Sequence, residues 1–203
     1  MPAPTRFSER TVDPDPLVQF QRWYDEALAA AVPDAHAMVL ATARRGGTPS
    51  ARMVLLRGVD ARGFVFFTNF ASRKAHELET TGSAALLFYW QPLHRQVRIE
   101  GAVERVADGE ADTYFASRPR GSQIGAWASP QSTSLPSRAD LEERVAETER
   151  RFRGTEVPRP PHWGGYRVLP TTIEFWQERP DRLHDRLVYR HGVEGWTIER
   201  LAP

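Results

Sequence analysis

The stretch AMVLATARRGGTPSARMVLLRGVDARGFVFFTNF, residues 37–70, decides the fold class. It contains three apolar runs typical of strands, at 37–44, 51–59 and 63–70. The short segments GGTPS and DARG separate these runs and are typical of turns. We therefore interpret the stretch as three short strands in succession.

Outward from this stretch, the chain continues as short strands with a few helices between them. Further strands are expected in five runs: SAALLFYW (83–90), RQVRIEGAVERV (95–106), YRVLPTTIEFWQ (166–177), RLHDRLVYR (182–190) and GWTIERLAP (195–203). Helices are expected after the N-cap Asp15, at 72–81, at 108–119 and at 137–154. This order predicts a mainly β fold with peripheral helices, an antiparallel barrel, because a doubly wound sheet alternates strands and helices throughout.

Length and composition favour one globular domain that is nearly neutral overall, so that any cationic site must be local. The chain has 203 residues, with 27 basic and 26 acidic side chains and a formal net charge of +1. Such a balance predicts no general nucleic-acid or membrane-surface binding. The absence of cysteine excludes disulfides and thiolate metal sites. The six histidines lack metal-ligand spacing, so we expect no metal.

The first residues differ in character from the rest of the chain. Residues 1–14 are polar and contain proline, so we expect a flexible arm followed by a single domain at 15–203. The arm lacks the apolar core of a secretory signal, and no apolar run approaches the roughly 20 residues that span a bilayer. We therefore expect a cytoplasmic protein.

Arginine and hydroxyl side chains gather beside the expected strands, and these groups suit anion binding. No P-loop, dinucleotide-binding glycine loop or nucleophile elbow is present. In FFTNFASRKAHEL (66–78), Thr68 ends a strand and SRK at 72–74 begins a helix, so a hydroxyl, two cations and helix amides converge. Lys74 is the single lysine of the sequence. An ordinary capped helix with a solvated basic turn explains this pattern about equally well.

Two further segments carry similar groups. Arg52 and Arg57 bracket an apolar run in RMVLLRG (52–58), where a buried strand with charged ends is the simpler interpretation. The segment RPRGSQIGAWASPQS (118–132) is a polar loop around a buried Trp127 if it stands alone. It also offers a second anion-binding set, which Tyr114 joins from one helical turn before: Arg118, Arg120, Ser122, Gln131 and Ser132.

The run RLHDRLVYR concentrates charge on one side. If it is a strand throughout, Arg182, His184 and Arg186 share one face. We expect that face to select anions beside the flat surface of Trp176, and the opposite face to anchor the strand in the core through its two leucines, Leu183 and Leu187. The alternative is a surface strand whose arginines pair with neighbouring aspartates, Asp181 and Asp185.

Together these motifs resemble one family, the pyridoxine/pyridoxamine 5'-phosphate oxidases, which bind FMN. The resemblance runs from about Asp13 to the C-terminal ERLAP. Its motifs occur in this order: RMVLLRG, FFTNFASRKAHEL, RQVRIEG, YFASRPRGSQIGAWAS, PHWGGYRV, IEFWQ, RLHDR and ERLAP. The resemblance implies an FMN-binding split barrel and a homodimer with FMN in two equivalent sites at the subunit interface.

The resemblance also implies site residues. Those implied for the flavin phosphate are Arg52, Arg73, Lys74 and Ser132. Those implied to line or contact the cofactor elsewhere are Met53, Val54, Leu55, Leu56, Arg57, Phe67, Thr68, Gln96, Gln131, Trp176 and Arg186. The substrate phosphate would meet Tyr114, Arg118 and Ser122, with Arg57 on the same side. Arg182 and His184 would flank the substrate ring as the catalytic pair.

The implied reaction oxidises pyridoxamine or pyridoxine 5'-phosphate to pyridoxal 5'-phosphate. Hydride passes from the substrate 4' carbon to flavin N5, and O2 reoxidises the flavin to give H2O2. The expected partners are therefore a phosphorylated small molecule, O2 and a second copy of the chain.

The sequence departs from the family pattern at two places, and two rival functions follow from the same fold. Arg57 stands where the family usually has lysine, so we expect an altered KM. The short N-terminal arm has no clear equivalent of a substrate-covering segment found in many members.

One rival is an FMN oxidase of the phenazine-pathway type, which would be expected to lack the set Tyr114, Arg118 and Ser122. The other is a non-enzymatic flavin-binding barrel, which needs no Arg182–His184 pair.

Overall fold

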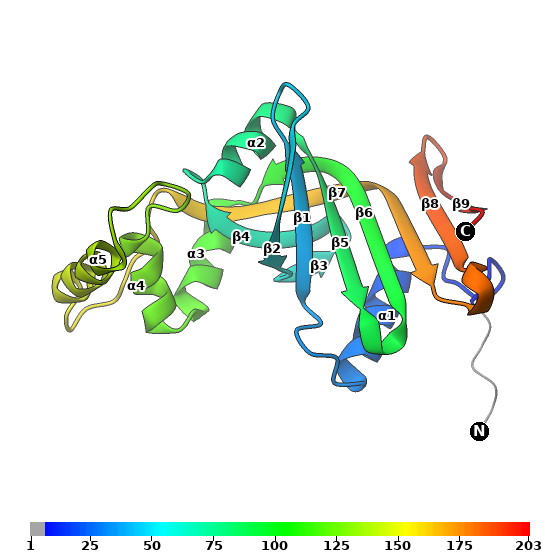
Figure 1. Cartoon of the computed structure of the whole chain (residues 1–203), viewed down its shortest axis with the longest axis horizontal. Coiled ribbons are helices and arrows are strands. Elements are labelled where there is room, and N and C mark those ends of the chain that lie inside the picture. The colour runs from blue at the N-terminus through cyan, green and yellow to red at the C-terminus, as the bar shows by residue number, and fades with distance from the viewer. Residues whose placement is uncertain (1–6) are drawn as a thin grey trace.

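A strongly curled antiparallel sheet dominates the computed structural model, which describes residues 7–203 (Figure 1). The strand order is β2-β1-β5-β6-β7-β4-β3, with β8 paired to β7 and β9 paired to β8. The strands of this part of the chain are β1 (Ala37–Ala43), β2 (Pro49–Leu55), β3 (Gly58–Asp60), β4 (Gly63–Asn69), β5 (Ser83–Trp90), β6 (Arg95–Arg105), β7 (Trp163–Gln177), β8 (Asp185–Gly192) and β9 (Gly195–Arg200). The predicted mainly β fold with peripheral helices is confirmed.

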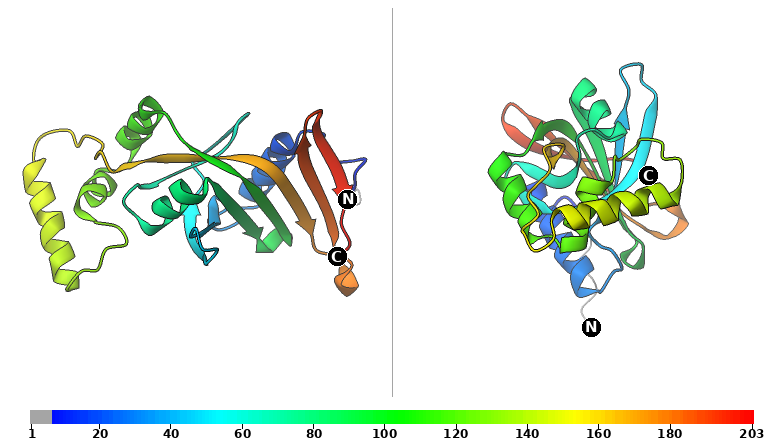
Figure 2. Two further views of the ribbon diagram at one scale, coloured as in Figure 1. Left: turned by 90° about the horizontal axis from the view of Figure 1, so that it is seen from above. Right: turned by 90° about the vertical axis from the view of Figure 1, so that its left-hand side faces the viewer.

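Helices surround the sheet, and the cap residues explain where two of them begin. They are α1 (Pro16–Ala29), α2 (Arg73–Thr81), α3 (Asp108–Ser117), α4 (Arg120–Ala128) and α5 (Arg138–Arg151). The Asp15 carboxylate accepts the Leu17 amide at 2.8 Å, and Pro16 occupies the first turn of α1. The Ser137 hydroxyl likewise accepts an amide of the first turn of α5. Helices α4 and α5 lie at one end of the molecule, and β8 and β9 lie at the other (Figure 2).

An aromatic cluster holds α1 against the sheet. The ring of Phe20 is fully buried and contacts Phe64 of β4 edge-on, with ring centroids 4.8 Å apart. It also contacts Phe88 and Trp90 of β5 at 5.1 and 6.0 Å. Because these residues come from strands on both sides of the curl, α1 fixes the curvature of the sheet. Burying rings of this size is a large apolar contribution to folding.

The longest strand pair, β6 with β7, contains a β-bulge. Glu100 faces Thr172, whereas Gly101 faces Pro170, so Thr171 is the extra residue on β7. Gly101 has no room for a side chain, since a Cβ there would lie 1.9 Å from the Leu169 carbonyl oxygen. The bulge and this close approach bend the pair and help the sheet to curl.

The single strand expected at 51–59 is two strands. Strand β2 ends at Leu55 and pairs with β1, whereas β3 begins at Gly58 and pairs with β4. The change of partner breaks the strand at Leu56 and Arg57, and the Arg57 amide bonds to the Val65 carbonyl at 2.8 Å. Helix α4 was also missed, because the glycines of its sequence RGSQIGAWA weaken helix propensity. Packing of Ile124 against Phe152, the C-cap of α5, stabilises α4 instead.

The prediction that RLHDRLVYR is one strand is wrong in its first half. Asp181 and Arg182 have left-handed backbone angles, φ 57° and 62°, inside a 3₁₀ turn at Pro180–Arg182. Strand β8 begins only at Asp185, so the run 182–186 does not share a strand face. Leu187 is fully buried as expected, but Leu183 is 68% exposed and does not anchor the core.

The expected flexible arm, residues 1–14, is packed from Phe7 onward, and its residues 1–6 lie outside the described part. The Phe7 ring is buried 4.9 Å from the Trp23 ring. The Tyr189 hydroxyl donates to the Asp13 carbonyl at 2.7 Å. These contacts bring the boundary of the packed domain forward from Asp15 to Phe7. Between residues 7 and 203, no helix has the length and apolar character needed to cross a membrane.

We predict that Gly101→Ala lowers the free energy of unfolding by about 1–3 kcal/mol, because its Cβ meets backbone that must shift. Urea denaturation followed by circular dichroism measures this change. Gly109→Ala, in the first turn of α3, is the matched control, since no atom lies within 4 Å of a Cβ built there. Equal stability of the two variants would contradict the role given to the bulge.

Candidate active site

A cavity of about 760 Å³ lies between β2, β4 and the helices α2, α3 and α4. Apolar side chains of β2 form one wall, and the ends of α3 and α4 form another. The site residues predicted from sequence that line this cavity are Met53, Val54, Leu55, Arg57, Phe67, Thr68, Lys74, Tyr114, Arg118, Ser122 and Gln131. The fold therefore brings together the segments predicted to hold two different anions.

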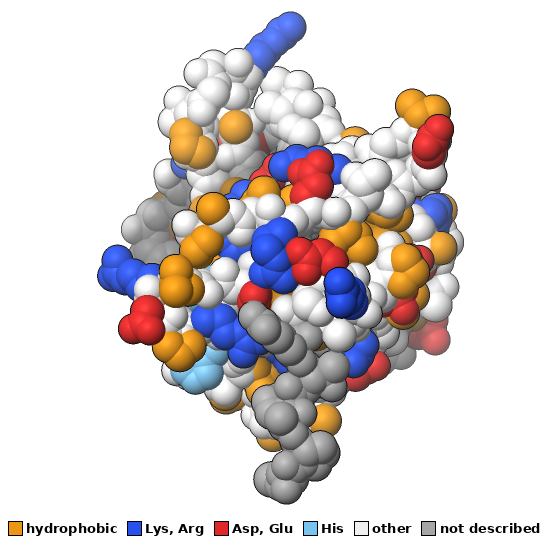
Figure 3. All heavy atoms as spheres, turned by 90° about the vertical axis from the view of Figure 1, so that its right-hand side faces the viewer, with side chains coloured by type: hydrophobic (Ala, Val, Ile, Leu, Met, Phe, Trp, Pro, Cys, Tyr) orange, Lys and Arg blue, Asp and Glu red, His pale blue; other side chains and the backbone are white. Residues whose placement is uncertain are grey.

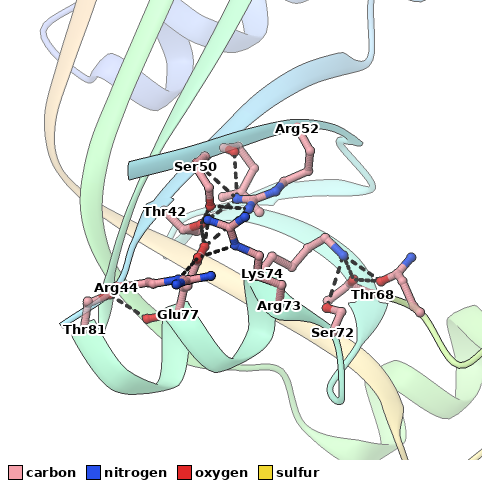
Figure 4. Close-up of polar contacts among 12 residues, drawn as sticks. Thr42, Arg44, Ser50, Arg52, Thr68, Ser72, Arg73, Lys74, Glu77 and Thr81 are labelled. Carbon is pink, nitrogen blue, oxygen red and sulfur yellow. Dashed lines mark hydrogen bonds and ion pairs between the residues drawn. The ribbon is translucent and has the colours of Figure 1, made fainter. Parts of the chain in front are cut away.

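The Lys74 side chain is buried in a neutral cradle at the edge of this cavity. Its Nζ donates to Gln131 Oε1 at 2.6 Å, Thr68 Oγ1 at 3.1 Å and Ser72 Oγ at 3.2 Å (Figure 4). Burial, reinforced by the charge of Arg52, lowers the pKa of Lys74 to about 8. No carboxylate of residues 7–203 forms an ion pair with this ammonium. A cation held by neutral groups alone is suited to an external anion.

Arg52 and Arg73 lie beside Lys74 but do not line the cavity. Arg73 Nε donates to Glu77 Oε1 at 2.8 Å, and Arg52 Nη2 lies 3.3 Å from Glu77 Oε2 (Figure 4). Arg73 and Ser132 line a second hollow, of about 580 Å³, on the other side of the first turn of α2. Leu56 is buried in the core and lines neither space.

Stacked rings form the far side of the cavity. Phe67 stacks on Tyr114 with centroids 4.1 Å apart and on Trp163 at 5.3 Å. The Arg118 guanidinium lies 4.8 Å from the Trp163 centroid, and its Nη1 is buried without a hydrogen-bond partner among the described residues. Burial lowers the pKa of Arg118, although the guanidinium stays charged. The Arg57 guanidinium lies 5.9 Å from the Tyr114 ring, so a second cation faces the same wall.

The remaining predicted residues form a separate set, which we call the C-terminal group: Gln96, Trp176, Arg182, His184 and Arg186. Gln96 faces Trp176 across β6 and β7, and Trp176 faces Arg186 across β7 and β8. The His184 ring lies 4.6 Å from the Trp176 ring. Arg186 donates to Glu174 at 2.8 Å and to the Ala202 carbonyl at 2.9 Å.

An ion network holds the loop that carries His184. The Arg179 amide donates to His184 Nδ1 at 3.2 Å, and the Arg179 side chain pairs with Asp185 at 2.6 Å. Asp185 also accepts from Arg200 at 2.7 Å, and Arg200 pairs with Glu9 at 2.8 Å. Burial would raise the pKa of Asp185, but the hydrogen bonds from both arginines lower it. Among the described residues, Asp185 thus pairs with Arg179 and Arg200 and not with the arginines of its own run, Arg182 and Arg186.

Within a single chain, the C-terminal group lies away from the cavity. Trp163, at the start of β7, contacts the cavity, and Trp176 lies near the end of the same 15-residue strand. At about 3.3 Å per residue, the path along the strand from Trp163 to Trp176 is roughly 40 Å. None of the C-terminal group lines the cavity. A ligand touched by both sets therefore needs a second copy of the chain.

The end of the molecule that carries β8 and β9 shows acidic, basic and apolar side chains intermixed (Figure 3). The described residues of this face form no broad patch of a single charge. This distribution agrees with the near-neutral net charge and with recognition at a local site.

Several cavity residues were missed from the sequence. They are Asn69, Ser117, Pro119, Gly125, Ala126, Ser129 and Trp163. Most of them adjoin predicted residues and carry no chemical signal of their own. Trp163 offered one cue in the sequence, the small residue Gly165 two positions later. A Cβ at Gly165 would lie 2.8 Å from the Phe67 ring, which stacks on Trp163, so the glycine indicates that an aromatic ring packs on this strand.

Two family models match this chain. Residues 24–151 match the model described as pyridoxamine 5'-phosphate oxidase. Residues 163–203, which include most of the C-terminal group, match the model described as the pyridoxine 5'-phosphate oxidase C-terminal dimerisation region. The protein is accordingly a homodimer.

Relatives and solved structures agree with these matches. A pyridoxine/pyridoxamine 5'-phosphate oxidase of Rubrobacter xylanophilus is 59% identical over 196 residues, covering 97% of this chain and 90% of the relative. One of Burkholderia multivorans is 60% identical over 198 residues, covering 96% and 92%. The structure of PhzG from Burkholderia lata 383, in complex with tetrahydrophenazine-1-carboxylic acid, is 34% identical with a TM-score of 0.92 over 98% of both chains.

A more distant structure shares the fold. It is a pyridoxamine 5'-phosphate oxidase-related, FMN binding protein of Nostoc punctiforme, 16% identical with a TM-score of 0.72 over 91% of this chain and 97% of that one. The predicted split barrel is thereby confirmed. On its family matches, its relatives and its fold, the chain belongs to the pyridoxamine 5'-phosphate oxidase family of oxidoreductases.

Proposed function

We propose that this protein oxidises pyridoxamine and pyridoxine 5'-phosphates to pyridoxal 5'-phosphate, with FMN as cofactor and O2 as the electron acceptor that yields H2O2. One observation carries the proposal: a single cavity has Lys74 on one side and Arg57 and Arg118 on another, and no carboxylate of the described residues pairs with any of them. Two such groups suit two phosphates, one on the cofactor and one on the substrate. The names of the relatives support the same reaction.

The cofactor is FMN, and the donors around Lys74 fit its phosphate. Lys74 supplies the buried charge, Arg52 is close enough for its charge to act on Lys74, and Arg73 and Ser132 offer further donors at the second hollow. The apolar wall of β2 gives the flavin ring a surface to lie on. Bound FMN supplies the hydride acceptor of the reaction, while the chain supplies position and charge.

The substrate phosphate has its donors on the opposite wall. Arg118 offers a guanidinium with an unpartnered Nη1, and Tyr114 and Ser122 offer hydroxyls within the same cavity. Arg57 adds a second charge next to the Tyr114 ring. This set binds an anion in a partly buried place, where a charge-assisted hydrogen bond is strong.

The homodimer completes each site. The roughly 40 Å along β7 prevent one chain from placing its C-terminal group in its own cavity. We therefore assign the C-terminal group of one subunit to the cavity of its partner. Two equivalent sites follow from the two-fold symmetry of such a dimer.

Within the C-terminal group, His184 and Arg182 act on the reacting end of the substrate. Because His184 Nδ1 accepts the Arg179 amide, the neutral imidazole carries its proton on Nε2. That N–H orients the substrate or moves a proton at its 4' substituent. Arg182 holds the ring and the same substituent in place.

A second candidate is oxidation of a different ring system, favoured by the similarity to PhzG, which was solved with a tetrahydrophenazine carboxylate. The cavity set Tyr114, Arg118 and Ser122 favours a phosphorylated substrate instead. The test is to purify the protein, record the flavin spectrum and follow H2O2 under air with each B6 phosphate and with a dihydro- or tetrahydrophenazine carboxylate. Turnover of the phenazine alone would select the second candidate, and a yellow protein inert to all would indicate a flavin-binding barrel.

We predict that Arg182→Ala and His184→Ala each lower kcat for the B6 phosphates by about 100-fold, since both act at the reacting carbon. The flavin should stay bound, because the predicted phosphate donors are untouched. Stopped-flow reduction of the bound flavin measures the first effect, and the absorbance of the purified variants measures the second. If Arg182→Ala instead released FMN with substrate binding intact, the role given to Arg182 would be wrong.

Arg57→Lys should change KM for the substrate by about threefold or more while activity survives, because lysine offers a point charge in place of a planar fork. Steady-state kinetics with both B6 phosphates measure the change. Arg62→Lys, on the turn between β3 and β4, is a control at an exposed ion pair outside the cavity. Identical KM and kcat in Arg57→Lys and the unchanged protein would remove Arg57 from substrate binding.

FMN affinity should fall above pH 8 and be about tenfold weaker at pH 9 than at pH 7. In the free protein, burial holds the pKa of Lys74 at about 8, and a bound phosphate raises it, so binding requires the proton that the free protein loses as pH rises. Fluorescence titration of flavin-free protein measures the affinity. Riboflavin, which lacks the phosphate, should show no such slope, and neither should Lys74→Met with FMN. A flat FMN profile in the unchanged protein would contradict the prediction.

A further inference from the structure

One carboxylate, that of Glu77, connects the arginines of the predicted phosphate site. It accepts from Arg73 Nε at 2.8 Å, lies 3.3 Å from Arg52 Nη2 and lies 3.8 Å from Arg44 Nε. Figure 4 shows these arginines converging on Glu77 from the turn after β1, from β2 and from α2, next to the separate cradle of Lys74. We infer that Glu77 is a positioning residue that presents Arg73 and Arg52 to the flavin phosphate. The inference rests on the proposed function.

The Glu77 carboxylate is itself held rigidly. Its side chain is 4% exposed and comes from the second turn of α2. The hydroxyls of Thr42 and Ser50 each donate to its Oε2 at 2.5 Å. Burial alone would raise the pKa of Glu77, but these hydroxyls and Arg73 lower it to about 2. The carboxylate is therefore charged at neutral pH and is held in one position by these bonds.

Arg73 is the residue most dependent on this carboxylate. Its side chain is 46% exposed, and the bond from its Nε is the one hydrogen bond that it makes within residues 7–203. Its two terminal amino groups remain available toward the hollow that Ser132 also lines. A long, exposed side chain loses considerable rotamer freedom when it binds an anion. Fixing Nε in advance removes part of that loss and leaves the fork directed at the ligand.

Arg52 depends on the same network through its neighbours. Its Nη1 donates to the Thr42 hydroxyl at 2.5 Å and its Nη2 to the Ser50 hydroxyl at 2.6 Å. Because both terminal amino groups of Arg52 are bonded within the protein, Arg52 contributes charge to the site. That charge already helps to lower the pKa of Lys74. Several cations thus lie close together, and the negative charge of Glu77 offsets the repulsion between them.

Removing the Glu77 charge has two opposing effects on an anion. It raises the positive charge of the site, which tightens phosphate binding, and it releases Arg73 and Arg52, which weakens it. Placement is expected to dominate, because the charge left unneutralised lies on the half-exposed Arg73, where water and salt screen it, whereas a displaced donor loses its hydrogen bond. The two effects predict opposite signs, so one measurement separates them.

The test compares Glu77→Gln with the unchanged full-length chain, both stripped of flavin and titrated with FMN and with riboflavin. FMN should bind about tenfold or more weakly to the variant, and riboflavin should bind equally to both. Glu79→Gln is the matched control on the same helix. Glu79 also accepts from an arginine, Arg105, and from Tyr166, but lines neither hollow, so both flavins should bind it as they bind the unchanged chain.

Unchanged or tighter FMN binding in Glu77→Gln would overturn the inference, and so would an equal loss for both flavins, which indicates a general structural defect. If Glu77→Gln does not fold, Thr42→Val serves instead, since it keeps the charge and removes one hydroxyl that fixes Glu77 and Arg52. It should weaken FMN selectively, and an equal loss would again overturn the inference. An unchanged chain that does not prefer FMN to riboflavin would refute the proposed function itself.

Discussion

The antiparallel pairing of β6 with β7 is the constraint on which the rest of the molecule depends. These two strands are central to the sheet, because β4, β5 and β8 pair with them directly and β1, β2, β3 and β9 attach through those strands. One end of β7 contributes Trp163 to the cavity, and the other end carries Trp176 and the attachment of β8. A rigid ladder of this length holds the two sets of functional side chains apart. Under the proposed function, assembly of a full site is therefore a property of the dimer and not of the single chain.

Burial of uncompensated positive charge is the second theme. Folding places Lys74 among a hydroxyl pair and an amide oxygen, and places Arg118 against an indole, without a carboxylate for either. Each arrangement costs stability in the free protein, because a buried charge loses hydration. Under the proposed function, that cost is recovered when the two phosphates bind. The arginines around Glu77 show the opposite solution, in which the protein supplies its own anion.

Much of this was predictable from the sequence. Alternating apolar runs and the capped helices at Asp15 and Ser137 are local signals, and the structure places them as expected. The segments around Lys74 and Arg118 do line one cavity, although Arg52, Arg73, Arg120 and Ser132 do not. The break after Leu55 was not predictable, because it follows from a change of pairing partner that periodicity does not record. The turn before β8 had a signal, since Pro-Asp at 180–181 is typical of a turn, but the alternation of charge in RLHDR concealed it.

Residues in contact across long sequence separations were the hardest to predict. Glu77 meets Thr42 and Ser50 from 35 and 27 residues away, and nothing in the helix pattern of 72–81 indicates that its carboxylate points inward. The same holds for Asp185 and its partner Arg200. Such pairs depend on the register of the sheet, which is fixed only when all strands are in place.

The network around Asp185 has a practical consequence for handling this protein. Arg200 of β9 connects the loop of His184 to Glu9, and the Ala202 carbonyl accepts from Arg186. Both ends of the described chain are thus fastened to the part of the molecule that bears the C-terminal group. A purification tag or truncation at either end acts on the same few ion pairs, so the two ends are not neutral sites for engineering.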